Sequence, residues 1–296
     1  MARKMLITGC SGFIGRHAVS YALAHGYSVV GFDIKPAGIK DRRFVFVRGS
    51  VTDRKAVVRA AKGCDYVLHL AAATSLPDFK RDLHANYSIN VTGFLNVIDA
   101  AKEAGCRKFA YASSSAVYLD EYAEDSVIDV KRLRNHYGKS KLINEMYADS
   151  YYDSYGLKSV GLRYFNIYGP GEDVKEMSSP ITKFIMEKRK NDTITIFGDG
   201  KQAKDFTHID DAIEITFRLI QDTGSTGVYN VGTGVATSFN RIAHLINPKK
   251  ITYIKNPYLS SYIFYLKADT RRLFRSIGKY KFITVEEGIS RMTGGN

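Results

Sequence analysis

Tyr137 and Lys141, four residues apart, are the pair of side chains with the clearest chemistry in this chain. They open a helix-period segment, in which this spacing places both side chains on one face. An ammonium close to a phenol favours the phenolate and lowers a pKa of about 10 towards neutral pH, so we predict a general acid and base here. Because 20 tyrosines make such a spacing common by chance, position matters: the pair follows a predicted strand that ends in Ser113, Ser114 and Ser115.

A second chemical signal is the glycine-rich turn Gly9-Cys-Ser-Gly12-Phe-Ile-Gly15, which lies between a predicted strand and a predicted helix. Glycines let the backbone approach a pyrophosphate, and the helix N-terminus offers it free N–H groups. Asp33 ends the next predicted strand, where a carboxylate accepts hydrogen bonds from adenosine ribose hydroxyls and favours NAD over NADP. Asp53 either accepts from the adenine amino group or caps the next predicted helix, and the sequence leaves both roles open.

Alternating strands and helices are predicted to position these groups. This alternation indicates an α/β fold with a Rossmann-type, doubly wound parallel sheet covered on both faces. The predicted strands are residues 5–8, 28–33, 44–47, 66–70, 108–113 and 159–164. The predicted helices are residues 13–25, 54–61, 83–104 and 137–155.

After residue 169 the predicted helices and strands become shorter and the loops more frequent. A helix is predicted at residues 209–220 and a strand at residues 228–231. We therefore expect an NAD-binding domain over residues 1–170, to which the chain returns around residues 206–232. Residues 171–296 are expected to form a smaller α/β substrate domain.

Composition excludes several classes of function. With 45% hydrophobic and 12% aromatic residues, the 296-residue chain is neither disordered nor fibrous. No apolar run approaches the ~20 residues of a membrane span and no secretory signal is present, so we expect a cytoplasmic protein without a membrane partner. Three cysteines without metal-type spacing predict no metal site. The net charge of +13 is spread along the chain, which favours a solvated basic surface over nucleic-acid binding.

Further motifs follow in chain order over nearly the whole sequence. They are His69-Leu-Ala-Ala72, Asn90-Val-Thr-Gly93, Val117-Tyr118, Leu162-Arg-Tyr-Phe-Asn166-Ile-Tyr-Gly-Pro170, Phe197-Gly-Asp-Gly200, Asp205-Phe-Thr-His-Ile-Asp-Asp211 and Tyr229-Asn-Val-Gly232. Together with the glycine turn, Asp33, the three serines and the tyrosine–lysine pair, they resemble the extended short-chain dehydrogenase/reductase family. Within it, the resemblance is to nucleotide-sugar epimerases and dehydratases, above all to UDP-glucose 4-epimerase. It implies bound NAD, a nucleotide-sugar substrate and a homodimer formed through the helices 83–104 and 137–155.

The resemblance also implies roles for individual residues. Ser114, four residues before Tyr118, binds the sugar hydroxyl with Ser115 as its neighbour, Tyr137 is the acid and base, and Lys141 is its electrostatic partner. Asn166 binds the substrate diphosphate, whereas His69 and Asn90 are expected to be structural. The implied cofactor-binding residues are Gly9, Gly12, Phe13, Ile14, Gly15, Asp33, Asp53, Leu70, Ala71, Ala72, Tyr137 and Lys141.

The residues after Ser114 favour epimerisation within this family. The resembling 4,6-dehydratases carry an Asp-Glu pair there, and UDP-glucuronate decarboxylases carry a glutamate at the second position, whereas this chain has Ser115 and Ala116. Asp33 opposes the use of NADPH as a consumed reductant. The implied reaction is the inversion of C4 of a UDP-hexose through a transient 4-keto sugar, with NAD held and recycled.

Two departures leave the substrate open. Lys204 stands where the family usually has an arginine, so the charge is kept but bidentate diphosphate binding is lost. The second diphosphate arginine falls near Tyr258 and Leu259, where this chain has none. The alternative functions are an NAD(P)H-dependent nucleotide-sugar 4-ketoreductase, another nucleotide-sugar modifier, and a non-catalytic NAD-binding relative.

Overall fold

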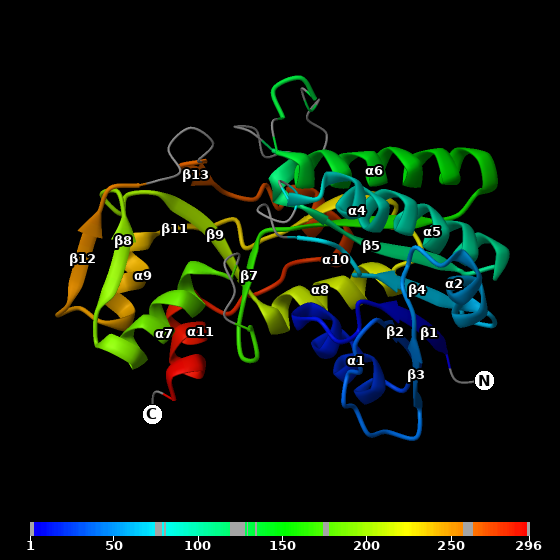
Figure 1. Ribbon diagram of the computed structural model, residues 1–296, viewed down its shortest axis with the longest axis horizontal. Coiled ribbons are helices and arrows are strands. Elements are labelled where there is room, and N and C mark those ends of the chain that lie inside the picture. The colour runs from blue at the N-terminus through cyan, green and yellow to red at the C-terminus, as the bar shows by residue number, and fades with distance from the viewer. Residues whose placement is uncertain are drawn as a thin grey trace.

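A seven-stranded sheet, parallel throughout, forms the centre of the larger part of the molecule (Figure 1). The structure, a computed structural model, describes residues 3–74, 79, 81–118, 128, 130–133, 135–173, 178–256 and 263–294. In sheet order the strands are β10 (Gly227–Val231), β6 (Ser159–Tyr164), β5 (Lys108–Ser114), β4 (Tyr66–His69), β1 (Lys4–Thr8), β2 (Ser28–Asp33) and β3 (Phe44–Arg48). The winding reverses between β1 and β4, and ligands of such sheets bind beside this point at the carboxyl ends of the strands. The predicted fold class is confirmed.

Helices cover both faces of the sheet (Figure 1). On one face lie α1 (Phe13–Ala24), α8 (Ile209–Gln221) and α10 (Arg271–Ile277); on the other lie α2 (Arg54–Ala61), α5 (Gly93–Glu103) and α6 (His136–Tyr155). Successive residues of β1 enter opposite cores, because Met5 and Ile7 pack beneath α1 while Leu6 packs towards α2 and α5. Burial on both faces explains why the strands are continuous apolar runs rather than alternating ones.

The helix predicted over residues 83–104 is three consecutive segments, which is the main difference between prediction and structure. They are α4 (Leu83–Tyr87), a π-helical turn η1 (Ser88–Thr92) and α5. Within the π turn, the buried Asn90 side chain hydrogen-bonds both the N–H and the C=O of Ala73, at 2.7 and 2.9 Å. This long-range contact accounts for the local widening of the helix, which no periodic pattern encodes.

The smaller part contains two further sheets and their helices. Around β9 (Ala203–His208) lie β7 (Asn166–Tyr168), antiparallel β11 (Ala236–Ser238) and the short β13 (Tyr265–Leu266), while β8 (Ile194–Phe197) pairs with β12 (Ile251–Ile254). The remaining helices are α7 (Pro180–Asn191), α9 (Phe239–Ile246) and α11 (Val285–Thr293), and a short 3₁₀ turn η2 (Ser115–Val117) follows β5. Ile181, Phe184, Phe206, Phe239 and Ile289 are buried together in a separate core.

The chain passes repeatedly between the two parts. After β9 it enters α8, which packs on α1 through Phe217 and Tyr21, and β10 then pairs with β6 in the central sheet. After β13 it returns again as α10, whose Leu273 is buried beside α8. Among the described helices, none combines the length and the apolar character needed to cross a membrane.

Candidate active site

The glycine-rich turn packs its backbone so tightly that two of its glycines exclude any side chain. A Cβ on Gly9, whose φ is +70°, would lie 2.7 Å from the amide nitrogen of Ala71. A Cβ on Gly15 would lie 2.0 Å from the carbonyl oxygen of Gly9. Gly9 therefore packs against the residues that follow β4, and the first turn of α1 packs against Gly9, at the switch point of the sheet.

Gly12 leaves the N-terminus of α1 open, as the binding of a dinucleotide phosphate requires. It is the N-cap residue, without a side chain to cap the helix, and no acidic residue occupies the first turn, which contains Phe13 and Ile14. A Cβ on Gly12 would approach only the carbonyl oxygen of Gly9, at 3.3 Å. The helix N-terminus thus presents backbone donors to an anion that approaches closely, so the residues present fit the pyrophosphate of NAD.

Asp33, the last residue of β2, lies beside this turn. Its Oδ2 accepts from the amide of Ser11 and its Oδ1 from the amide of Lys35, both at 3.1 Å. The carboxylate is therefore fixed between the glycine turn and the end of β2, where adenosine ribose hydroxyls would meet it.

Asp53 caps α2, which was one of the two roles left open. Its Oδ1 accepts from the amide of Ala56 at 3.0 Å. Leu70, Ala71 and Ala72 follow β4; the amide of Leu70 bonds to the carbonyl of Thr8, and the amide of Ala71 to the Thr8 hydroxyl. These residues therefore line the same edge of the sheet as the glycine turn.

Ser114, Tyr137 and Lys141 come together at the ends of β5 and α6. The Ser114 hydroxyl accepts from the amide of Ala116 at 3.1 Å and hydrogen-bonds the phenol of Tyr137. Lys141 is 2% exposed, donates to the carbonyl oxygen of Ala112 at 2.8 Å, and lies 5.6 Å from the centre of the Tyr137 ring. The three predicted catalytic side chains thus form one cluster.

The charge states of this cluster are governed by burial. Burial raises the pKa of Tyr137 to about 12, although the hydrogen bond from Ser114 opposes this increase. Burial lowers the pKa of Lys141 to about 8, while the charge of Glu145 acts in the opposite direction. Without a ligand, the phenol is therefore protonated at neutral pH, and the expected activation by Lys141 does not outweigh desolvation.

Sequence reasoning missed an ion pair behind these residues. Glu145 and Arg163 are both buried, and Glu145 accepts from Arg163 Nη2 at 2.7 Å and from Arg163 Nε at 2.9 Å. The hydroxyl of Ser113, next to Ser114, also donates to Glu145. The available signal was spacing, because Tyr137, Lys141 and Glu145 follow one another at intervals of four residues.

His69 and Asn90 are structural, as expected. His69 is a buried residue of β4 whose Nδ1 lies 2.7 Å from the Thr8 hydroxyl, and burial lowers its pKa to about 3. Asn90 joins the loop after β4 to α6, because its Nδ2 also donates to the Ser140 hydroxyl at 3.0 Å. Within the described part of the chain, no three metal-ligating side chains are grouped as an ion would require.

The predicted substrate-binding residues come from both parts of the molecule. Ser115 is buried in η2, and the side chain of Asn166 donates to the carbonyl of Asp205 at 2.9 Å. Lys204 donates to the carbonyl of Ile263, and burial lowers its pKa to about 8. Tyr258 and Leu259 lie outside the described residues.

Asp205, adjacent to Lys204, is a second buried carboxylate that sequence reasoning did not single out. It accepts from the amide and hydroxyl of Thr233, the amide of Gly234 and the amide of Ala268, at 2.7–3.1 Å. It therefore ties β9 to the segments after β10 and β13.

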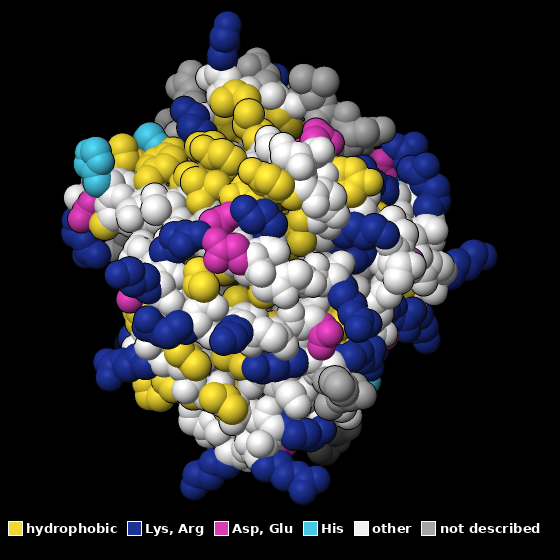
Figure 2. Space-filling view, turned by 90° about the vertical axis from the view of Figure 1, so that its right-hand side faces the viewer, with side chains coloured by type: hydrophobic (Ala, Val, Ile, Leu, Met, Phe, Trp, Pro, Cys, Tyr) yellow, Lys and Arg dark blue, Asp and Glu magenta, His cyan; other side chains and the backbone are white. Residues whose placement is uncertain are grey.

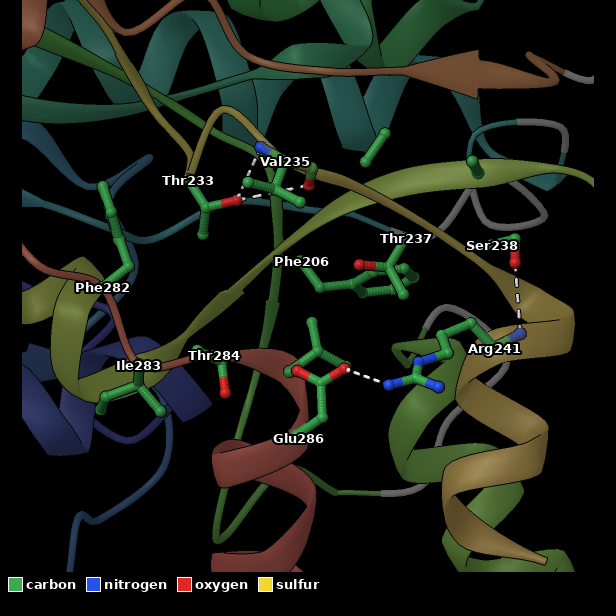
Figure 3. A pocket seen from close by; sticks show the side chains of 13 residues that line it. Phe206, Thr233, Val235, Thr237, Ser238, Arg241, Phe282, Ile283, Thr284 and Glu286 are labelled. Atoms are coloured by element: carbon green, nitrogen blue, oxygen red, sulfur yellow. Dashed lines mark hydrogen bonds and ion pairs between the residues drawn. The ribbon is translucent and has the colours of Figure 1, made fainter. Parts of the chain in front are cut away.

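A cavity of about 590 Å³ lies in the smaller part, between β9, β11 and the start of α11 (Figure 3). Phe206 and Thr237 face it from the strands, and an ion pair between Arg241 and Glu286, 3.1 Å long, closes one side. None of the predicted catalytic or cofactor-binding residues lines this cavity. The candidate active site is instead the carboxyl edge of the central sheet.

Comparison with known proteins agrees with this geometry. The family model described as "NAD dependent epimerase/dehydratase family" matches residues 5–232. The chain is 29% identical to the UDP-glucuronate 4-epimerase of Thermodesulfobacterium geofontis, over 97% of this chain and 94% of that protein. The crystal structure of UDP-glucose 4-epimerase from Thermotoga maritima with UDP-glucose has a TM-score of 0.89 at 25% identity, covering 99% and 98% of the two chains.

A second solved structure contains the cofactor. The complex of Thermus thermophilus UDP-glucose 4-epimerase with NAD has a TM-score of 0.82 at 26% identity, covering 99% of this chain and 98% of that one. The sequence motifs, the sheet order and these similarities all lead to one assignment. The chain belongs to the NAD-dependent epimerase/dehydratase family.

Proposed function

We propose that the protein is an NAD-dependent nucleotide-sugar epimerase that inverts C4 of a UDP-hexose through a transient 4-keto sugar. The observation that carries this proposal is the cluster of Ser114, Tyr137 and Lys141 beside a dinucleotide cradle. Ser115 and Ala116 follow Ser114, so this position lacks the Asp-Glu pair that resembling dehydratases use for elimination. The names of the relatives, which include epimerases of UDP-glucose and UDP-glucuronate, support the substrate class.

Each catalytic residue has one task in this proposal. NAD, held by the glycine turn and Asp33, would supply the redox chemistry, because its nicotinamide can take up and give back a hydride. Tyr137 removes the proton of the 4-hydroxyl and later returns it, while Ser114 orients that hydroxyl. The Lys141 ammonium, buried against β5, stabilises the phenolate and holds the nicotinamide ribose. Asp33 binds the adenosine ribose and selects NAD over NADP.

The smaller part of the molecule is proposed to bind the nucleotide. Residues 171–296 would form the nucleotide-sugar domain, apart from α8, β10 and α10, which pack with residues 1–170 around the central sheet of the NAD domain. Asn166 and Lys204, on the paired strands β7 and β9, would contact the diphosphate. Since Lys204 offers a single ammonium rather than an arginine fork, we expect weaker orientation of the diphosphate at this point.

We further propose a homodimer through α5 and α6. Hydrophobic side chains gather in the upper part of the face shown in Figure 2, where these helices lie. On α6, Met146 is 62% exposed and Tyr155 is 60% exposed, with Tyr147 and Tyr152 also exposed. Light scattering at micromolar concentration is expected to give the dimer mass, and a monomer would contradict this proposal.

The test is an NMR assay of a panel of UDP-, GDP- and dTDP-hexoses, with the protein's bound nucleotide identified after denaturation. We expect interconversion of C4 epimers without a net change in absorbance at 340 nm. Tyr137→Phe should lower kcat about 10²-fold or more, because a general acid–base contributes 10²–10⁴-fold. Tyr253→Phe, which alters an exposed tyrosine of β12 outside the cluster and the proposed dimer face, is the matched control.

The same assay separates the alternatives. A 4-ketoreductase would consume NAD(P)H in proportion to product, and a non-catalytic relative would bind NAD without turnover. Full activity of Tyr137→Phe would show that the catalytic assignment is wrong.

A further inference from the structure

Helix α6 carries a line of ionisable side chains along its buried face. Tyr137, Lys141 and Glu145 are separated by four residues each, so they lie one above the other on one side of the helix. Their side faces the ends of β5 and β6. The proposed mechanism uses the first two residues and leaves Glu145 unexplained.

Glu145 joins three elements at once. Its side chain is 6% exposed, and it accepts from Ser113 on β5 and from both Nε and Nη2 of Arg163 on β6. A buried ion pair of this kind contributes little net stability, because desolvation offsets the attraction between the charges. Its presence is therefore better explained by what it positions.

The contacts of Glu145 set the place of the catalytic groups. Ser113 precedes Ser114 in β5, and Glu145 lies on the helix that begins with Tyr137. A fixed distance between Glu145 and Ser113 therefore fixes the register of α6 against the strand that carries Ser114. Since catalytic geometry tolerates displacements of well under ~1 Å, this register affects turnover.

Arg163 extends the network to the smaller part of the molecule. Its Nη1 donates to the Tyr118 hydroxyl at 2.7 Å, which in turn donates to Asn230 Oδ1 at 2.7 Å. Asn230 Nδ2 donates to the carbonyl of Asp269 at 3.1 Å. The groups that hold α6 are thus connected to the segment after β13.

The charge of Glu145 also acts on Lys141. Burial lowers the pKa of Lys141 to about 8, and the carboxylate of Glu145 raises it. The other ionisable groups around Lys141 are Tyr137 on α6, His69 on β4 and, behind Glu145, Arg163 on β6. Tyr137 and His69 are uncharged at neutral pH, because burial raises the pKa of the phenol and lowers that of the imidazole.

We propose that Glu145 is a positioning residue of this active site, which locks α6 against β5 and β6 and keeps Lys141 charged beside Tyr137. The proposal rests on the proposed function for its effect on turnover. Its effect on Lys141 can be measured independently, through NAD binding.

Glu145→Gln is the first variant, since it keeps the size and hydrogen-bonding oxygen of the side chain and removes its charge. In the unaltered protein, NAD affinity is expected to fall as the pH rises through about 8, because the Lys141 ammonium is lost there. In Glu145→Gln, calorimetric titrations with NAD at a series of pH values should show the midpoint of this fall in affinity about one pH unit lower. At pH 8, kcat should fall about fivefold with KM for the sugar within about threefold, because the charged fraction of Lys141 drops from about one half to about one tenth.

Two further variants separate positioning from stability. The double variant Glu145→Leu/Arg163→Met removes both charges, so it leaves no unpaired buried charge and is expected to keep its melting temperature. It should nevertheless show a lowered midpoint, by less than Glu145→Gln does, because the positive charge of Arg163 is lost as well. Asp149→Asn, which removes an exposed carboxylate one turn further along α6, is the matched control and should keep the original midpoint within about 0.2 of a pH unit.

Each outcome is decisive. A lowered midpoint in both Glu145 variants, but not in Asp149→Asn, supports the proposal. An unchanged midpoint in the double variant overturns it, even if Glu145→Gln is less stable. If the unaltered protein turns over none of the nucleotide sugars, the proposed function fails, whereas the NAD midpoints still decide the role of Glu145.

Discussion

Lys141 donates a hydrogen bond to the carbonyl oxygen of Ala112 at 2.8 Å. This bond attaches helix α6 to the strand that ends in Ser114, and it fixes the direction of the ammonium within a buried site. The ammonium lies 5.6 Å from the centre of the Tyr137 ring, so its charge acts on the phenol. Because the acceptor is a backbone atom of β5, the sheet itself sets the position of Lys141.

Tyr137 should remain a phenol in the ligand-free protein. Burial raises its pKa to about 12, and a raised pKa of a phenol means that the neutral form persists to higher pH. The phenolate absorbance of the unaltered protein minus that of Tyr137→Phe is therefore expected to be near zero up to about pH 10. With NAD bound, the difference should appear at lower pH, since the nicotinamide ring is positive. A phenolate signal below pH 9 without ligand would contradict the prediction.

Gly15→Ala should abolish NAD binding. The new Cβ would lie 2.0 Å from the carbonyl oxygen of Gly9, which is backbone and cannot move without displacing the turn. We expect a loss of about 2–3 kcal/mol in the free energy of unfolding, measured by urea denaturation, and no calorimetric response to NAD. Gly224→Ala is the control, because its Cβ would meet nothing closer than 3.7 Å. Normal NAD affinity in Gly15→Ala would show that the turn is not the cradle.

Asp33→Asn should narrow the preference for NAD over NADP. The amide keeps one acceptor oxygen for the turn but loses the charge that repels a 2′-phosphate. We expect the ratio of the two affinities to fall about tenfold in calorimetric titrations, chiefly through weaker NAD binding. Asp65→Asn, at the opposite end of the sheet beside Lys4, should leave the ratio unchanged. An equal ratio of NAD affinity to NADP affinity in both variants would show that Asp33 does not contact the cofactor.

Two substitutions of Asp53 should separate its role in helix capping from its role in NAD binding. Asp53→Ala removes the cap of α2 and should lower the free energy of unfolding by about 1 kcal/mol. Asp53→Ser restores a capping oxygen and should restore stability, but it should leave NAD binding weaker, because the carboxylate for the adenine amino group is missing. Recovery of both properties in the serine variant would restrict Asp53 to helix capping.

The main sheet was predictable because its strands are buried on both faces. Residues 28–33 and 159–164 are strands in the structure with the predicted bounds. Helix 83–104 was predicted without its π turn, since that turn depends on the contact between Asn90 and Ala73, which local periodicity does not contain.

The candidate site was only partly predictable, for a similar reason. Ser114, Tyr137 and Lys141 carry a recognisable spacing, and the sheet brings them together. Glu145 and Arg163 lie 18 positions apart on different elements, and each reads from the sequence as an ordinary surface charge. Burial of paired charges is decided by the tertiary fold, so their role became visible only once α6 was placed on β5 and β6.

The return of β10 to the central sheet has a consequence for synthesis on the ribosome. β10 supplies the hydrogen-bonding partner of β6, and α8 covers α1 from the same late stretch of the chain. The NAD-binding fold is therefore incomplete until residue 231 has left the ribosome. By then the strands β7, β8 and β9 and the helix α7 of the smaller part have already been released. A fragment that stops near residue 170 would expose β6 as an open edge, prone to pairing with other chains. The two parts must therefore fold together, and neither can be exchanged for another domain at a single position in the chain.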